Sequence, residues 1–316
     1  MPVNIPRELP ARVTLESENV FVMTRGRATH QDIRPLRIAI VNLMPTKVDT
    51  ETQLLRVLGS TSLQVEITLL HMGSHESRNT PTKHLDAFYA TFDQVKGQKF
   101  DGLVITGAPV EKLPFEEVDY WPELCEVLDW SAEHVFSTLH VCWGAQAALY
   151  RHYGVKKYPL DEKMFGIFTH RVLDARSPVM HGFDDTFAAP HSRHTEIRAE
   201  DVRGVPELQL LADSDEAGVY LAATRDGRQL FVTGHPEYDA ATLGGEYERD
   251  AALGLPISPP RNYFPDDDPS RPPRVTWRSH AFLLYANWLN FCVYQRTPYD
   301  LAAIPAEPRL DDDSDA

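Results

Sequence analysis

Cys142, His235 and Glu237 are the residues whose types and positions suit covalent chemistry. Cys142 stands where an apolar, strand-like run (VFSTLHV) passes directly into a helix-like run beginning at Gly144. A nucleophile on such a sharp strand-to-helix turn projects out of the sheet, and the helix N-terminus stabilises a thiolate. Backbone N–H groups there can also bind an oxyanion. Cys142 is therefore the candidate nucleophile, although a lone buried cysteine is more often structural.

The second motif, Gly234-His235-Pro236-Glu237, directly follows another strand-like run. A thiolate nucleophile needs a base, and the base needs an orienting partner. His235 supplies the first function and Glu237 the second. On its own the motif equally fits a surface His beside a surface Glu, but together with a strand-end Cys it favours a catalytic triad. Cys125 and Cys292 lie in helix-like runs on apolar faces and are interpreted as structural.

A third motif, Thr106-Gly107-Ala108-Pro109, also ends a strand-like run. A Gly-containing turn there brings backbone N–H groups towards the nucleophile. Gly107 and Ala108 are thus candidates for part of an oxyanion hole. An ordinary turn explains the motif equally well when it is taken alone.

The elements that must position these motifs alternate between strand and helix in the first half of the chain. This alternation predicts an open, flavodoxin-like parallel α/β sheet with helices on both faces, whose sites lie at the carboxyl ends of the strands. The predicted strands are Arg37–Leu43, Leu63–Leu70, Gly102–Gly107 and Val135–Val141, and the predicted helices are Val48–Leu58, Thr82–Val95, Pro122–His134 and Gly144–His152.

The second half has a different pattern, with a hairpin turn signal at Arg225–Arg228. We predict a lead-in segment over 1–35, irregular in structure, a single α/β domain over 36–300, and a disordered acidic tail over 301–316. The predicted strands here are Gly166–Leu173, Leu208–Ala212, Val219–Thr224 and Gln229–Gly234; helices are predicted over Thr242–Leu253 and Trp277–Tyr294, with a proline-rich loop over Leu255–Pro273.

Composition restricts the class of protein. The 316 residues carry a formal net charge of −15, which disfavours nucleic acids and anionic membranes as partners. Three widely spaced cysteines fit neither a disulfide framework nor a zinc cluster, and favour a cytoplasmic location. We see no signal peptide and no membrane span. His71…His75 and His191…His194 have tolerable ligand spacing but no acidic or Cys partners, so no metal site is expected.

The three strand-end motifs resemble the class I glutamine amidotransferase-like superfamily, which has a Gly-x-Cys-x-Gly-x-Gln elbow and a later His-Pro-Glu. This chain departs from that pattern at position 140, where His replaces Gly. The whole chain, to about Thr297, is more similar to the homoserine O-acyltransferases of methionine biosynthesis. The motifs that carry this resemblance are Met1–Pro6 (MPVNIP), Asn42–Lys47 (NLMPTK), Thr106–Pro109 (TGAP), His140–Gln146 (HVCWGAQ), Pro190–Arg193 (PHSR) and Gly234–Tyr238 (GHPEY).

The resemblance implies a ping-pong reaction. Cys142 takes the acyl group from acyl-CoA as a thioester, CoA leaves, and His235, oriented by Glu237, deprotonates the hydroxyl of homoserine. Acyl-CoA is a co-substrate, no further cofactor is expected, and the protein is expected to be a homodimer. The resemblance places Lys163, Ser192 and Arg249 at the amino-acid substrate, and the candidates for the acyl site and oxyanion hole are Lys47, Gly107, Ala108 and Trp143.

Glu111 bears on the acyl donor. In the family that the chain resembles, Gly at this position accompanies succinyl-CoA and Glu accompanies acetyl-CoA. The physics agrees, because two like charges ~4 Å apart at an effective dielectric of ~20 repel by about 4 kcal/mol. That is nearly three orders of magnitude in discrimination against a succinyl carboxylate. We therefore predict an acetyltransferase, unless Glu111 points to solvent.

Three alternatives remain at this stage. The first is the same enzyme with succinyl-CoA as donor. The second is a glutaminase subunit, which the elbow and the His-Pro-Glu motif would serve equally well but which lacks the Asn42–Lys47 and Pro190–Arg193 motifs. The third is a catalytically dead binding module. Serine also stays open as an acceptor, because one methylene is worth only ~1–3 kcal/mol in a pocket.

Overall fold

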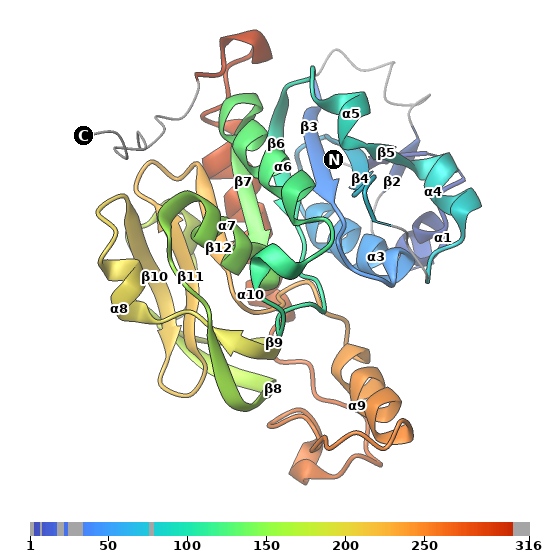
Figure 1. Cartoon of the computed structure of the whole chain (residues 1–316), viewed down its shortest axis with the longest axis vertical. Coiled ribbons are helices and arrows are strands. Elements are labelled where there is room, and N and C mark those ends of the chain that lie inside the picture. Colours follow the sequence, from blue (N-terminus) through green and yellow to red (C-terminus); the bar gives the residue numbers. More distant parts are fainter. Residues whose placement is uncertain (1–2, 7, 18–21, 25–33, 76–78, 306–316) are drawn as a thin grey trace.

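A computed structural model describes residues 3–6, 8–17, 22–24, 34–75 and 79–305. One mixed sheet organises this part of the chain, in the order β2-β1-β4-β3-β6-β7-β12-β11-β10-β8-β9, with β5 paired to β4 (Figure 1). Neighbours from β2 to β12 are parallel. Neighbours from β12 to β9 are antiparallel. The parallel half is the predicted α/β architecture, and the antiparallel half extends it from β12.

The described strands are β1 (Val3–Ile5), β2 (Val22–Thr24), β3 (Leu36–Val41), β4 (Val65–His71), β5 (Tyr89–Thr91), β6 (Phe100–Ile105), β7 (Val135–Val141), β8 (Tyr158–Val172), β9 (Thr186–Glu196), β10 (Leu208–Ser214), β11 (Gly218–Thr224) and β12 (Gln229–Val232). The α-helices are α1 (Ala11–Ser17), α3 (Lys47–Leu58), α4 (Thr82–Phe88), α5 (Phe92–Val95), α6 (Trp121–His134), α7 (Trp143–Tyr153), α8 (Ala199–Arg203), α9 (Thr242–Ala252) and α10 (Arg278–Asn287). A π-helical segment, Trp288–Tyr294, continues α10.

Apolar side chains leave both faces of the parallel strands, so the sheet has a core on each side. Successive residues of a strand point to opposite faces. Accordingly, Ile38 and Ile40 belong to a core cluster that includes residues of α1, α3 and α10, whereas Ala39 and Val41 belong to a cluster that includes residues of α5, α6, α7 and α8. A third, smaller cluster joins β8 to α9, which stands beyond the end of the sheet in Figure 1. Helices therefore cover both faces, as the continuous apolar runs predict.

Two sequence predictions in this architecture are wrong. Thr82–Val95 is not one helix, because Tyr89–Thr91 pairs with β4 as β5 and separates α4 from α5. The buried Glu51 carboxylate accepts a hydrogen bond from the Tyr89 hydroxyl at 2.7 Å, a tertiary contact that local helix propensity does not reveal. The lead-in is also not irregular where it is described, because it forms α1 and adds β1 and β2 to the sheet.

The remaining segments of the prediction have different outcomes. Strand β9 was not predicted, and β8 begins at Tyr158 rather than Gly166. Pro190 argues against a central strand, but β9 is the last strand in the sheet order, where proline is tolerated. Leu255–Pro273 is irregular apart from a short 3-10 helix at Pro265–Asp267. Most of the predicted acidic tail, 306–316, lies outside the described residues.

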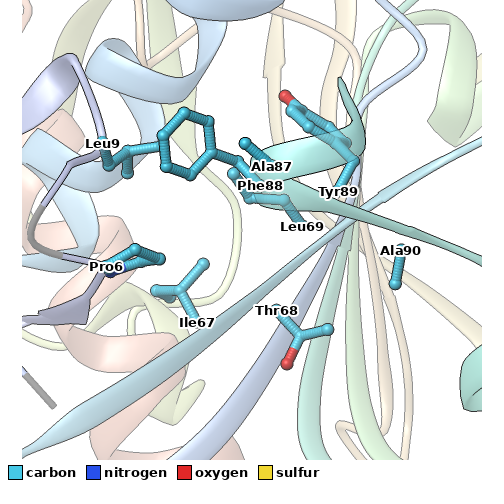
Figure 2. A pocket seen from close by; sticks show the side chains of 9 residues that line it. All are labelled: Pro6, Leu9, Ile67, Thr68, Leu69, Ala87, Phe88, Tyr89 and Ala90. Atoms are coloured by element: carbon cyan, nitrogen blue, oxygen red, sulfur yellow. The ribbon is translucent and has the colours of Figure 1, made fainter. Parts of the chain in front are cut away.

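A small cavity of about 220 Å³ lies between β4, the α4–β5 junction and the N-terminal segment (Figure 2). Its lining is mostly apolar, and the one phenol in it, Tyr89, is hydrogen-bonded to Asn42 and Glu51. Pro6, the last residue of the Met1–Pro6 motif, lines this cavity, but none of the candidate site residues does. In the described ranges, no helix is long and apolar enough to cross a lipid bilayer.

The packing between sheet and C-terminal helix generates a stability prediction at Gly102, in β6. A Cβ there would lie 2.7 Å from Ile38 Cδ1 and 3.1 Å from Trp288 Cζ2. Gly102→Ala should therefore lower the free energy of unfolding by about 1–3 kcal/mol through overpacking. Gly97→Ala is the matched control, because a Cβ there meets nothing within 4 Å. Urea unfolding that gives both variants wild-type stability would contradict the packing described here.

Candidate active site

The β7–α7 junction places Cys142 in a backbone conformation that residues other than glycine rarely adopt, with φ 52° and ψ −116°. Its N–H donates to the Val232 carbonyl at 2.7 Å, and its carbonyl accepts from Ala145 N at 3.0 Å. Gly144 is required by close approach, since a Cβ there would lie 2.6 Å from the Thr106 carbonyl oxygen. The neighbouring strands thus hold the turn in its strained form.

Cys142, His235 and Glu237 form one hydrogen-bonded chain. His235 Nδ1 lies 2.8 Å from Glu237 Oε1, and the Cys142 sulfur is within hydrogen-bonding contact of the His235 ring. All three are buried, with exposed fractions of 7%, 4% and 7%. The Tyr238 ring stacks on the imidazole with centroids 4.1 Å apart. The structure therefore brings together the three residues that the sequence singles out.

Strand β9 contacts the backbone of the turn that carries His235. The Pro190 carbonyl accepts a hydrogen bond from His235 N at 2.9 Å. A Cβ on Gly234 would lie 2.8 Å from the same carbonyl oxygen, so this position needs glycine. The Arg193 guanidinium is fully buried and donates to backbone carbonyls, including that of Thr195 at 2.8 Å. Within the Pro190–Arg193 motif, only Ser192 lines the large cavity described below.

The electrostatics of this site favour the imidazolium form of His235. Burial alone would lower the pKa of His235, but the Cys142 thiolate and the Glu237 carboxylate outweigh burial and hold that pKa well above its usual value. Oε2 of Glu237 is buried and has no hydrogen-bond partner among the described residues. The hydrogen bonding of this carboxylate is therefore directed at His235, as an orienting group requires.

The backbone around Gly107 lies directly against the nucleophile. A Cβ on Gly107 would lie 3.2 Å from Cys142 Cβ and 3.4 Å from His235 Cε1, so glycine leaves room for an oxyanion here. Ala108 lines the cavity above the thiol. The Trp143 side chain is fully buried against Phe115 and Tyr120, so only its backbone can serve the site.

Lys47 occupies a different place from the other acyl-site candidates. Its ammonium donates to the carbonyl oxygens of Asn42 at 2.6 Å and Met44 at 3.3 Å. Burial lowers the pKa of Lys47 to about 8. The side chain does not line the cavity, whereas Met44 and Thr46 of the same turn do. Lys47 therefore shapes the turn at the end of β3.

Cys142 and His235 line a cavity of about 750 Å³. This volume suits a small-molecule site. Its wall brings together residues from the β6–α6 loop, the antiparallel strands and α9. The candidate site residues that line it are Ala108, Glu111, Cys142, Lys163, Ser192, His235 and Arg249. Nowhere in the described residues do three or more His, Cys, Asp or Glu side chains gather in a way that could hold a metal ion.

Glu246 is a cavity residue that sequence reasoning missed. Its carboxylate accepts from Ser192 Oγ at 2.6 Å and from Tyr238 OH at 3.1 Å, and it lies 3.2 Å from Lys163 Nζ. Asp250, one helical turn on, pairs with Arg249 at 2.7 Å. Residues three and four apart share a helix face, so the spacing of Glu246, Arg249 and Asp250 was the available signal. When their contacts are not known, these three residues are interpreted from the sequence as solvated charges.

The contact between Cys142 and His235 predicts selective alkylation at Cys142. Burial raises the pKa of Cys125 and brings that of Cys292 to about 12, so both remain protonated near neutral pH. Iodoacetamide should therefore modify Cys142 first, as read by peptide mass spectrometry. Glu237→Gln removes one of the two groups that favour the imidazolium and should slow this reaction. Equal modification of the three cysteines in folded protein would contradict the electrostatic assignment.

Comparisons with known proteins agree with the geometry. Residues 2–299 match the family model described as homoserine O-succinyltransferase. The homoserine O-acetyltransferase of Acetivibrio thermocellus is 64% identical over 301 residues, 95% of this chain and 99% of that one. The homoserine O-acetyltransferase of Brevibacillus brevis is 63% identical, covering 95% and 98%. The fold is similar to that of a glutamine amidotransferase from Thermotoga maritima, with TM-score 0.53 at 11% identity over 81% of this chain and 98% of that one. This chain belongs to the homoserine O-succinyltransferase family.

Proposed function

We propose that this chain is a homoserine O-acetyltransferase of L-methionine biosynthesis that works through a thioester on Cys142. The observation that carries the proposal is the hydrogen-bonded chain from Cys142 to His235 to Glu237 at the wall of a large cavity. The names of the two relatives support the same activity. The reaction needs no resident cofactor, because acetyl-CoA is consumed as a substrate.

In the first half-reaction, the Cys142 thiolate attacks the carbonyl carbon of acetyl-CoA and forms the new C–S bond. The negative charge moves to the carbonyl oxygen, where backbone N–H groups at Ala108 and Trp143 can stabilise it. Collapse of this intermediate breaks the bond to CoA. The imidazolium of His235 gives its proton to the departing sulfur, which leaves neutral His235 and an acetylated Cys142.

In the second half-reaction, neutral His235 takes the proton from the homoserine hydroxyl as its oxygen attacks the thioester. Glu237 holds the imidazole so that the ring nitrogen opposite Nδ1 faces the reactants, and it stabilises the imidazolium that forms. Collapse releases O-acetylhomoserine and restores the thiolate–imidazolium pair. Protons and electrons balance over the two halves without another reactant.

The charges of α9 and its neighbours suit an amino acid. Glu246 offers a carboxylate to the homoserine ammonium, and it already contacts Lys163 and Ser192. Arg249, which lines the same cavity, offers a guanidinium to the homoserine carboxylate. This arrangement separates the acceptor's charged groups from its hydroxyl, which must reach Cys142.

Glu111 favours acetyl over succinyl as the acyl group. It lines the same cavity as Cys142, so it does not simply point to bulk solvent. A succinyl chain would place a second carboxylate in this space, and the two charges would repel each other. Succinyl transfer, which the family description names, is the alternative donor specificity. A homodimer and a cytoplasmic location stay predictions.

The proposed intermediate predicts a mass change. Intact-protein mass spectrometry after mixing with acetyl-CoA, without acceptor, should show one acetyl group, which homoserine then removes. Cys142→Ser should no longer form an acetyl adduct that homoserine removes, while Cys125→Ser and Cys292→Ser should still form it. A succinyl adduct formed in preference to acetyl would keep the mechanism and overturn the donor assignment. No adduct with either donor would contradict the proposed function.

The acceptor subsite predicts a selective kinetic effect. Glu246→Gln should lower kcat/KM for homoserine about 10- to 100-fold, because a hydrogen bond to a charged group contributes roughly 1.5–3 kcal/mol. The rate of Cys142 acetylation without acceptor should stay close to that of the wild type. Glu248→Gln, on an exposed position of the same helix, is the matched control. Equal slowing of both half-reactions by Glu246→Gln would argue against an acceptor role.

A further inference from the structure

The loop that carries Glu111 is held by a lysine from a distant part of the chain. Lys157 lies between α7 and β8, and its ammonium donates to the carbonyl oxygens of Glu111 at 2.7 Å and Leu113 at 2.5 Å. The same ammonium lies 4.4 Å from the centroid of the Phe115 ring. One cation therefore fixes three points of the loop.

The Glu111 carboxylate has no comparable anchor of its own. Within the described residues it makes no hydrogen bond and no ion pair, although it lines the cavity that contains Cys142. The position of this carboxylate therefore depends on its backbone and on charge attraction to Lys157 and His194. That backbone is held by Lys157 and by the turn hydrogen bond from Leu113 N to the Val110 carbonyl at 3.0 Å.

The anchor belongs to the same rigid unit as the nucleophile. Phe115 is buried against the rings of Trp121 and Tyr150, with centroid separations of 5.1 Å and 4.7 Å. Tyr150 lies on α7, the helix that begins immediately after Cys142. Lys157 follows the end of this helix by a few residues. The spacing between the Glu111 backbone and the thiol is thus fixed through α7 at both ends.

We propose that Lys157 is a positioning residue for acyl-donor selectivity, which holds the Glu111 carboxylate where a second carboxylate on the acyl chain is repelled. This inference rests on the proposed acetyltransferase function. Repulsion between two charges falls with their separation and with the surrounding dielectric. A released loop would let Glu111 turn towards water, which weakens its effect on succinyl-CoA. The uncharged acetyl group would be little affected.

The test compares Cys142 acylation rates with acetyl-CoA and succinyl-CoA, without acceptor, by intact-protein mass spectrometry. Lys157→Met keeps the apolar stem and removes both hydrogen bonds. It should lower the acetyl-to-succinyl rate ratio about tenfold, mostly through faster succinylation, as expected when a repulsion of roughly 1.4 kcal/mol is lost. Lys157→Arg, which retains a cationic donor, should restore much of the ratio. Lys156→Met is the matched control, since Lys156 is exposed.

A double variant separates positioning from general damage. If Lys157 acts through Glu111, adding Lys157→Met to Glu111→Gly should not change the donor ratio further. A Lys157→Met ratio equal to that of the wild type, or equal slowing with both donors, would overturn the inference. Should Lys157→Met fail to fold, Lys157→Gln is subject to the same criterion. Absence of any adduct in the wild type would instead contradict the proposed function.

Discussion

The positive φ of Cys142 is the constraint on which the rest of the site depends. Such a conformation costs of order 1–3 kcal/mol and persists only where its surroundings over-determine it. Here the Val232 carbonyl holds the Cys142 N–H, and Gly144 packs against the end of β6. Because β6, β7 and β12 are neighbours in the sheet, Gly107, Cys142 and His235 all follow adjacent strand ends. The strained turn and the strand order together define where a thioester would form.

The antiparallel half of the sheet brings charged and polar side chains to the cavity beside the nucleophile. Strands β8 and β9 bring Lys163 and Ser192 to the cavity, and α9 places Glu246 against both side chains. The β6–α6 loop brings Glu111 to the same cavity from another side. The groups to which the proposed mechanism gives donor and acceptor roles thus come from separate elements. This separation suits two half-reactions that share one sulfur atom.

Sequence reasoning succeeded where a residue's chemistry and its local pattern agree. The buried runs that became β3, β6 and β7 are continuous and apolar, and the motifs at their ends are short and specific. It failed where a distant partner decides the outcome. Tyr89–Thr91 forms a strand because it pairs with β4 and because the Tyr89 hydroxyl donates a hydrogen bond to Glu51. Strand β9 tolerates Pro190 because it is the last strand in the sheet order. The roles of Glu246 and Lys157 depend on contacts with residues far along the chain, and a single sequence does not reveal these contacts.

Initial-rate kinetics with acetyl-CoA and homoserine varied together test most directly whether the acyl group passes through Cys142. If CoA leaves before homoserine reacts, double-reciprocal plots at several fixed homoserine concentrations should be parallel lines. Intersecting lines would show direct transfer within a ternary complex. That result would contradict a covalent role for the strained cysteine around which this site is built.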